Sequence, residues 1–265
     1  MCIALKYGIW NTQHLAGARK AQLLRGAHIC FVACSRWLGN MASNSRLLQG
    51  RKIACIPNTI NINLFRPRNK HTARTALRLP QDKRLILFSS HMLDDERKGF
   101  HYLKEASIRL VAEHPEWKDT LGIVLVGKKM EPTMCENIPL QVYPLNYIAD
   151  EKVMVDVYNA VDLYAIPSLQ DNLPNTIVEA MACGIPCIGF NVGGIPEMID
   201  HLHNGYIAEY KNVADLADGI HWLLTEGEYD ILSREAARKA ANTYGENSVA
   251  MKYIGVYNRM TGKNE

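Results

Sequence analysis

The sequence predicts an α/β protein with one complete doubly wound parallel sheet and part of a second sheet before it. Short segments that are almost wholly apolar, such as 84–90, 122–127 and 162–168, alternate with longer helix-like stretches. Strands that are apolar on both faces are typical of parallel sheets with helices on either side. The composition indicates a globular chain, because 48% of the 265 residues are hydrophobic and 22% are charged. Disordered, collagen-like and small disulfide-rich proteins are thereby excluded.

Local patterns give the order of the elements. A helix-like stretch stops at Gly184, and glycine is a common helix terminator. The asparagine-rich segment 58–67 closes with Pro67 and is expected to be a connector. We expect strands at 28–35, 52–57, 84–90, 122–127, 142–146, 162–168, 186–191 and 205–210, and helices at 37–48, 98–113, 150–160, 175–183 and throughout 213–260.

The strands divide the chain into unequal parts. Residues 58–235 hold enough strands and crossovers for one complete doubly wound domain. Residues 1–57 hold only two strand candidates, which is fewer than a whole sheet needs. We therefore expect this part to be the remnant of a second domain, and to be the least stable part of the chain because its strand edges are unpaired.

Basic residues are concentrated in the first third of the chain. Residues 1–80 contain thirteen Lys and Arg and no acidic residue, whereas the other 185 residues hold all 27 acids. Such an excess favours an anionic partner, namely a membrane surface, a phosphate-bearing substrate or a nucleic acid, unless it is only a solvated face. Because no series of aromatic residues alternates with the bases, we expect no nucleic-acid partner.

Several other kinds of protein and site are excluded by the sequence. It has no apolar run long enough to span a membrane, and the N-terminus lacks the pattern of a secretory signal. Seven cysteines are an odd number without metal-ligand spacing, so we expect reduced thiols in a cytosolic protein. The pair His201-x-His203 lacks further ligands at suitable spacing and is expected to be a surface pair.

Three loops each follow a predicted strand and lead into a helix: 89–99, 168–176 and 191–197. Ligands of open parallel sheets bind outside the carboxyl ends of the strands. The helix N-termini at that edge favour anions. Three such loops around one crevice would suit a diphosphate.

The middle loop carries two carboxylates eight residues apart. Asp171 lies in the loop and Glu179 about one turn into the following helix. Placed in this way, they can hold two hydroxyl-bearing parts of one ligand while helix N–H groups between them face its phosphates. Local structure offers another interpretation, because Thr176 and Glu179 have capping-box spacing and Asp171-Asn172 is a typical turn pair. The spacing leaves both interpretations open.

The segment SLQDNLPNTIVEAMACGIPCIGFNVGGIPEMI at 168–199 resembles the signature of family 4 (group 1) glycosyltransferases, which have the GT-B fold. Segment 31–67 resembles the Ser-x-Trp-Leu helix and the Ile-Pro-Asn connector of that family. RKGF at 97–100 resembles its Lys-Gly phosphate loop, and 244–260 resembles its closing helix. The resemblance implies a GT-B-like protein in which 236–265 is a C-terminal helix that returns to the N-terminal side.

The resemblance also implies a site for a nucleotide-sugar donor. Glu179 would bind the ribose hydroxyls, and Asp171 would lie at the hydroxyls of the donor sugar. Lys98, together with Arg97, would pair with the diphosphate, so Asp171 and Lys98 are the expected catalytic residues. The other implied donor-binding residues are Ser90, His91, Leu145, Asn172, Leu173, Pro174, Asn175 and Thr176.

The implied function is that of a retaining glycosyltransferase. It would move a sugar from a nucleotide-sugar donor to a hydroxyl of a sugar or a lipid-linked acceptor, without a metal ion. Because this part of the enzyme offers no evident base, the departing phosphate would take the acceptor's proton. Such an enzyme would act in the cytoplasm, with its basic part in peripheral contact with the anionic inner face of the membrane.

The chain departs from the family pattern in three respects. The first acid is Asp171 rather than Glu, and Ser-Ser-His at 89–91 stands where the family has Gly-Arg, so Arg97 is the candidate for the missing cation. Most of an acceptor-binding domain would have to precede Met1. We therefore expect an N-terminally truncated enzyme with weak or no transfer activity. The alternatives are a non-catalytic fragment that binds a nucleotide sugar or a partner, and a basic membrane-surface module.

Overall fold

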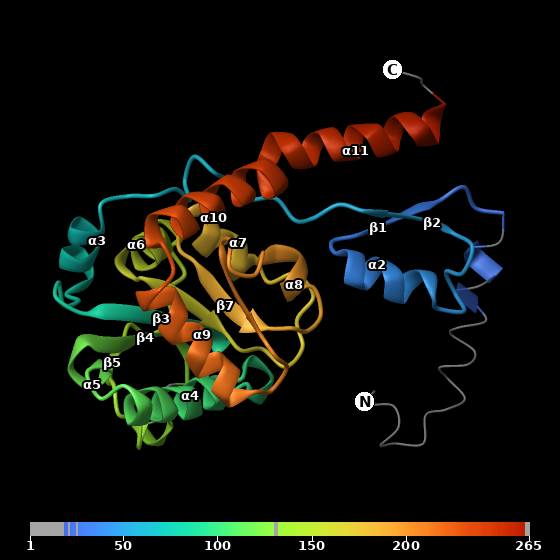
Figure 1. Ribbon diagram of the computed structural model, residues 1–265. Helices are drawn as coiled ribbons and strands as arrows, with labels where there is room; N and C mark the ends of the chain where they lie inside the picture. The colour runs from blue at the N-terminus through green and yellow to red at the C-terminus, as the bar shows by residue number, and fades with distance from the viewer. Residues whose placement is uncertain (1–18, 21, 25, 130–131, 263–265) are drawn as a thin grey trace.

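The computed structural model describes residues 19–20, 22–24, 26–129 and 132–262, which form two parallel sheets with their helices (Figure 1). The larger sheet has six strands in the order β5-β4-β3-β6-β7-β8, so the chain starts in the middle and extends to each side in turn. Its strands are β3 (Arg84–Met92), β4 (Leu121–Lys128), β5 (Gln141–Pro144), β6 (Leu163–Ile166), β7 (Cys187–Phe190) and β8 (Gly205–Ala208). The predicted doubly wound parallel sheet is confirmed.

Helices cover both faces of this sheet (Figure 1). On one face lie α3 (Lys70–Leu77), α6 (Glu151–Ala160), α7 (Asn175–Ala182), α8 (Ile195–Met198) and α10 (Tyr229–Tyr244). On the other lie α4 (Phe100–Glu113), α5 (Trp117–Thr120) and α9 (Val213–Thr225). The helix α7 begins at the carboxyl end of β6, which is where the sequence predicts the ligand site.

The strands read as unbroken apolar runs because alternate residues are buried on opposite faces. In β3, Leu85 and Leu87 pack with the residues of α6 and α7, whereas Ile86 and Phe88 pack with those of α4 and α9. None of the four is more than 1% exposed. Full burial of such a side chain contributes about 1.5–3 kcal/mol to the free energy of unfolding.

The second sheet is a separate small unit. It consists of β1 (Cys30–Ala33), α2 (Arg36–Ser43) and β2 (Lys52–Cys55), with β1 and β2 paired in parallel. The last helix, α11 (Glu246–Thr261), extends across to this unit, where its Val249 and Val256 form a small core with Ile56 (Figure 1). That this unit is the remnant of a second domain stays a prediction, and residues 1–18 of the predicted remnant lie outside the described residues.

Some elements differ from the prediction. The helix expected at 37–48 ends at Ser43, and the short polar helix α3 was not predicted. The tail 213–260 is helical as expected, but it is broken into three helices at 226–228 and at Gly245. The boundary predicted between 235 and 236 falls inside α10. The division of the chain into domains remains a prediction.

We predict that the amides of β1 and β2 exchange hydrogen faster than those of β3, β4 and β6. A two-stranded sheet leaves each strand with an unpaired edge, and Val32 in β1 is 40% exposed. Hydrogen exchange followed by mass spectrometry measures this difference peptide by peptide. Equal protection of the two sheets in a monomeric sample would contradict the prediction.

Candidate functional site

The loops after β3, β6 and β7 meet at the carboxyl edge of the large sheet, as predicted. The three strands are neighbours in the sheet. The backbone N–H of Leu169 donates to the carbonyl oxygen of Arg97 at 2.8 Å, and that of Gly194 donates to the carbonyl oxygen of Asp171 at 3.2 Å. The middle loop is therefore tied to both of its neighbours by backbone hydrogen bonds.

An ion pair joins the two predicted catalytic residues. Nζ of Lys98 lies 2.6 Å from Oδ2 of Asp171, and their side chains are 22% and 15% exposed. The other carboxylate oxygen, Oδ1, accepts a hydrogen bond from the backbone N–H of Asn172 at 3.1 Å. The pair thus places a cation that suits a phosphate beside a carboxylate that suits a hydroxyl group.

Glycines allow the three loops to pack so closely. Gly99 has a φ of +73°, and a Cβ atom there would lie 1.9 Å from the carbonyl oxygen of Pro167. Cβ atoms on Gly193 and Gly194 would lie 1.8 and 1.7 Å from the carbonyl oxygens of segment 171–172. Any side chain at these positions would push the loops apart. The glycine pair of the third loop therefore supports the backbone of the predicted site directly.

The N-terminus of α7 lies next to the ion pair. Pro174 is the N-cap residue, and no side chain of the described residues caps the helix. The N–H groups of Asn175 and Thr176 are therefore available to an anion, whereas that of Ile177 donates to the carbonyl oxygen of Pro174 at 3.1 Å. Of the predicted lining residues, Leu173 and Pro174 are buried, Thr176 is half-buried and Asn175 is exposed.

Glu179 lies one turn further along α7, where a buried tyrosine holds it. The hydroxyl of Tyr158 in α6 donates to Oε2 of Glu179 at 2.7 Å. The capping box that the spacing allowed is wrong, because Thr176 lies inside the helix. Its Oγ1 instead accepts from the hydroxyl of Tyr164 in β6 at 2.8 Å. Both tyrosines are fully buried.

The environment of Glu179 disfavours its charge. Burial raises the pKa of the Glu179 carboxyl, the hydrogen bond from Tyr158 opposes this rise, and the negative charge of Glu151 adds to it. Burial and the charge of Glu179 raise the pKa of Tyr158 well above its usual value, so its hydroxyl stays protonated and donates. An ionised Glu179 therefore gains most from a ligand that brings further hydrogen-bond donors.

Two other predicted residues are engaged in local contacts. The guanidinium of Arg97 donates to the carbonyl oxygen of Gln170 at 3.1 Å and pairs with Asp95 at 2.9 Å. Arg97 thus stabilises the middle loop through its hydrogen bond to the backbone of Gln170. The hydroxyl of Ser90 donates to the carbonyl oxygen of Met92 at 2.7 Å, which stabilises the start of the first loop.

Two further residues that are expected to bind the donor, His91 and Leu145, lie at a small aromatic cluster. The ring of His91 packs edge-on against Tyr147 with 5.2 Å between centroids, and Nζ of Lys128 lies 4.3 Å from the centroid of the same ring. Tyr147 is 44% exposed. Leu145 packs against the core and donates its backbone N–H to Leu125 at 2.9 Å. His91 and Lys128 lie at the carboxyl ends of β3 and β4, and Leu145 and Tyr147 follow β5, on the side of the sheet away from β6 and the middle loop.

The small N-terminal unit also contacts the site. The hydroxyl of Ser35 donates to Oδ1 of Asn172 at 2.5 Å. The carboxylate of Glu197 in α8 accepts from the backbone N–H groups of Arg36 and Trp37 at 2.9 and 2.7 Å. Glu197 therefore supplies the acid that the first turn of α2 lacks. Neither contact could be predicted from the sequence, because each joins segments that are far apart in the chain.

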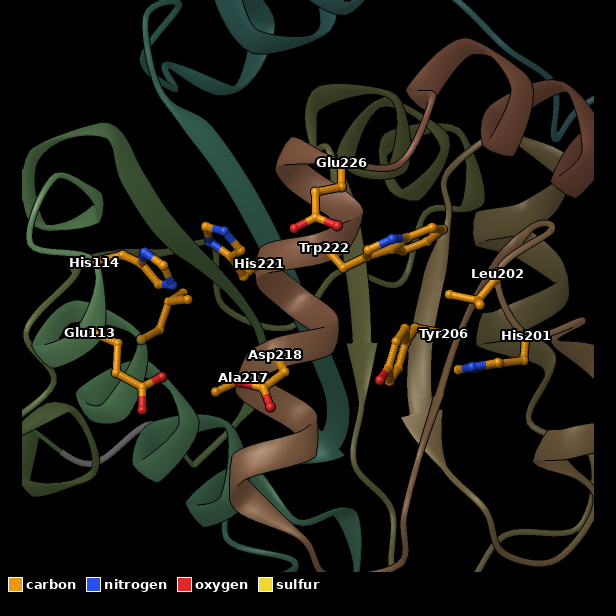
Figure 2. A pocket seen from close by; sticks show the side chains of 11 residues that line it. Glu113, His114, His201, Leu202, Tyr206, Ala217, Asp218, His221, Trp222 and Glu226 are labelled. Carbon is orange, nitrogen blue, oxygen red and sulfur yellow. The ribbon is translucent and has the colours of Figure 1, made fainter.

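A pocket of about 430 Å³ lies at the other end of α4, away from the three loops (Figure 2). Its side chains come from the end of α4, from segment 201–206 and from α9. The rings of His114 and His221 stack there at 3.8 Å, and Nδ1 of His201 accepts from the backbone N–H of Ile207. No residue of the predicted donor site lines this pocket.

In the part of the chain that the structure describes, neither a metal centre nor a membrane-spanning helix is found. This part contains no group of three or more His, Cys, Asp or Glu side chains arranged to hold a metal ion. None of its helices has both the length and the apolarity to cross a bilayer. The predicted contact of the basic residues with an anionic membrane surface stays a prediction.

A sequence profile of the family described as Glycosyl transferases group 1 matches residues 83–226. The chain belongs to this family. The matched stretch runs from β3 through α9 and contains all three loops of the candidate site. The family resemblance seen in the sequence is thereby confirmed.

Relatives of this group 1 glycosyl transferase are named as sugar-transferring enzymes. An uncharacterized glycosyltransferase of Haemophilus influenzae is 23% identical over 259 residues, which are 95% of this chain and 69% of the relative. A D-inositol 3-phosphate glycosyltransferase of Thermobispora bispora is 28% identical over 75% of this chain and 48% of its own length. An N,N'-diacetylbacillosaminyl-diphospho-undecaprenol alpha-1,3-N-acetylgalactosaminyltransferase of Campylobacter jejuni is 28% identical over 54% of this chain and 38% of its own. The chain thus spans half or less of two of these relatives.

Solved glycosyltransferases share its fold. A glycosyltransferase of Rickettsia africae superposes with a TM-score of 0.77 and 19% identity over 92% of this chain and 67% of the other. Anabaena HepE, crystallised with UDP, gives a TM-score of 0.73 and 20% identity over 96% of this chain and 70% of the other. These structures are GT-B glycosyltransferases, so the expected GT-B-like fold is confirmed.

We predict that Gly194→Ala lowers the free energy of unfolding by more than about 1 kcal/mol, because its Cβ would collide with the loop that carries Asp171. Gly255→Ala in α11 is the control, since only Nη1 of Arg259, at 3.5 Å, lies near the added Cβ. We expect that control to raise the free energy of unfolding by up to ~1 kcal/mol through helix propensity. Urea denaturation measures both. Wild-type stability of Gly194→Ala would contradict the account of the loops.

Proposed function

We propose that the candidate site binds a nucleotide-sugar donor, from which the complete enzyme transfers the sugar to an acceptor hydroxyl with retention of configuration. The observation that carries this proposal is the order of groups along one segment. Asp171 comes first, the uncapped N-terminus of α7 second and Glu179 third. A nucleotide sugar presents a sugar, a diphosphate and a ribose in the same order.

The diphosphate would bind between the two carboxylates. The N–H groups of the first turn of α7 favour an anion, and Lys98 brings a full positive charge beside them. A diphosphate would compete with Asp171 for the ammonium group of Lys98. Asp171 would then be released to accept hydrogen bonds from the hydroxyls of the donor sugar.

The same groups account for the proposed chemistry. Breaking the bond between sugar and phosphate leaves a new negative charge on the diphosphate. Each hydrogen bond to a charged group is worth about 1.5–3 kcal/mol, and a preorganised donor aimed at developing charge is worth ~10²–10³ in rate. Lys98 and the N-terminus of α7 would stabilise the departing group without a metal ion. The departing phosphate would accept the proton of the acceptor hydroxyl.

The comparisons support the classes of donor and acceptor. HepE was crystallised with UDP and with UDP-glucose, which are a nucleoside diphosphate and its sugar conjugate. The name of the Campylobacter relative gives it an acceptor linked to undecaprenol through a diphosphate. A lipid-linked acceptor would lie in a membrane. The basic residues of the first third of the chain would then be attracted to its anionic surface.

We predict that the chain binds a nucleoside diphosphate but transfers sugar poorly. The loops that would hold the donor are all present, whereas the chain spans half or less of the length of two relatives. A screen of nucleoside diphosphates should raise the melting temperature, because ligand at ~100 times its Kd adds about 2.7 kcal/mol to the free energy of unfolding. Robust transfer by the chain alone would contradict the expectation of weak activity. Binding with no transfer by any longer form would favour a non-catalytic protein.

Three substitutions should have distinct effects on ligand affinity. We expect Glu179→Gln to weaken a nucleoside and a nucleoside diphosphate alike by about tenfold, because an amide oxygen replaces a carboxylate toward the ribose. Lys98→Ala should weaken the diphosphate by about tenfold and leave the nucleoside unchanged. Asp171→Asn should weaken only the intact sugar donor. Calorimetric titration of each variant with the three ligands measures this pattern.

The control for this pattern is stability. Burial raises the pKa of Glu179 in the folded protein, so its ionised form costs stability at neutral pH and this cost disappears as the pH falls. The amide of Glu179→Gln avoids that cost and still accepts from Tyr158. We therefore expect this variant to be at least as stable as the wild type at pH 7. Unchanged affinities in Glu179→Gln and Lys98→Ala would contradict the proposed donor site.

A further inference from the structure

The hydrogen bond between Tyr158 and Glu179 joins the candidate site to the interior of the protein. Glu179 is half-buried, on the side of α7 that faces α6. Tyr158 is 0% exposed, and its hydroxyl donates to Oε2 of Glu179 at 2.7 Å. A buried phenol that reaches a functional carboxylate from inside the protein can fix the direction of that carboxylate while the ligand binds from outside.

We propose that Tyr158 is a positioning residue, which holds Oε2 of Glu179 so that Oε1 is presented to the ribose hydroxyls of the donor. This inference rests on the proposed function, because it deepens the role given to Glu179. The hydrogen bond restricts rotation of the carboxylate, which would otherwise have to be ordered when the ligand binds. It also stabilises the ionised form, which accepts hydrogen bonds from both hydroxyls.

The packing around Tyr158 supports a fixed position for its hydroxyl. Its ring lies 6.4 Å from that of Phe65 and 6.1 Å from that of Tyr164, in tilted and edge-on arrangements. The hydroxyl of Tyr164 is itself fixed, since it donates to Thr176 at 2.8 Å and accepts from Ser89 at 3.2 Å. Two buried tyrosines thus donate hydrogen bonds to side chains of α7, Tyr164 at its first turn and Tyr158 at Glu179.

Other titratable groups face Glu179 from the elements around it. They are Glu151 at the start of α6, Tyr164 on β6 and Cys183 at the end of α7. Glu151 acts against ionisation of Glu179, as burial does. Tyr158 donates a hydrogen bond that favours ionisation. Removal of the Tyr158 hydroxyl should therefore raise the pKa of Glu179 further, because burial and the charge of Glu151 would no longer be opposed.

The test measures the Glu179 carboxyl itself. Carboxyl carbons labelled with ¹³C are followed by NMR as a function of pH in the wild type and in Tyr158→Phe, with Glu179→Gln to assign the signal. The phenyl ring keeps the contacts with Phe65 and Tyr164. We expect the midpoint of the Glu179 titration to rise by about one pH unit in Tyr158→Phe. An unchanged midpoint would overturn the proposal, whether or not the protein binds nucleotides.

A chemically matched control uses another phenol bound to a carboxylate. Tyr206 on β8, two strands away from β6, donates to Asp215 at 2.7 Å and lines the pocket of Figure 2. Tyr206→Phe removes the same kind of hydrogen bond, and we expect it to leave the Glu179 titration as in the wild type. A rise equal to that of Tyr158→Phe would show a general effect of lost stability and would overturn the specific role.

Binding of the nucleoside that corresponds to the nucleoside diphosphate chosen by the thermal screen gives the functional readout, because a nucleoside has no phosphate that titrates in the same pH range. Because ionised Glu179 is the form that accepts hydrogen bonds, affinity should fall as the pH drops through its titration. In Tyr158→Phe this fall should begin about one unit higher, and in Glu179→Gln it should be absent. Superimposable profiles of the wild type and Tyr158→Phe would overturn the positioning role. A pH-dependent fall retained in Glu179→Gln would instead contradict the ribose contact of the proposed function.

The wild type alone provides a check that does not depend on folding of the variant. If the Tyr158 hydroxyl donates to Glu179, the ring resonances of Tyr158 should shift with the same midpoint as the Glu179 carboxyl. Ring resonances that do not respond to this titration would overturn the proposal.

Discussion

The candidate site depends on direct contact between the backbones of three loops. The middle loop after β6 touches the loop after β3 through Gly99 and the loop after β7 through Gly193 and Gly194. Each contact leaves no room for a side chain. Lys98 directly precedes Gly99, and the backbone of Asp171 is in contact with Gly193 and Gly194. The ion pair between these charged side chains exists because of the close backbone packing beneath it.

The carboxylates of Asp171 and Glu179 have different surroundings. Asp171 has a cation at 2.6 Å, and its charge is thereby compensated. Glu179 is half-buried, its acidic neighbour Glu151 disfavours its ionisation, and a phenol from α6 donates a hydrogen bond to it. A carboxylate in the second situation gains more from two hydroxyl donors than one that already has a counter-ion. This difference agrees with the assignment of the ribose to Glu179 and of the sugar to Asp171.

Much of this architecture could be predicted because its signals are local in the sequence. The strands of the large sheet are buried on both faces, and so they stand out as short apolar runs. The site loops follow from the rule that ligands bind at the carboxyl ends of parallel strands. The helix α3 was missed because it is short and polar, with only Ala73 and Arg74 buried. Asn69 caps its N-terminus by accepting a hydrogen bond from the backbone N–H of Thr72, and its buried side packs against α6, which lies some 80 residues further along the chain.

The contacts at the site that the sequence did not predict have a common cause. Thr176 and Glu179 have the spacing of a capping box, but α7 begins one residue before Thr176. The side chains of Thr176 and Glu179 instead accept hydrogen bonds from two tyrosines of other elements. Tyr158 and Tyr164 occur in apolar segments and read as core residues. The sequence feature that could have indicated these contacts is the tyrosine itself, because a buried tyrosine needs a hydrogen-bond partner for its hydroxyl. Contacts such as that of Glu197 with α2 join segments some 160 residues apart and have no local signal.

A crystal structure of the chain with a bound nucleoside diphosphate tests the central claim most directly. The account predicts the ribose hydroxyls at the carboxylate of Glu179, the phosphates at the N-terminus of α7, and Nζ of Lys98 on a phosphate oxygen rather than on Asp171. A nucleotide bound elsewhere, such as in the pocket of Figure 2, would contradict it. So would a nucleotide at this edge of the sheet whose ribose makes no contact with Glu179.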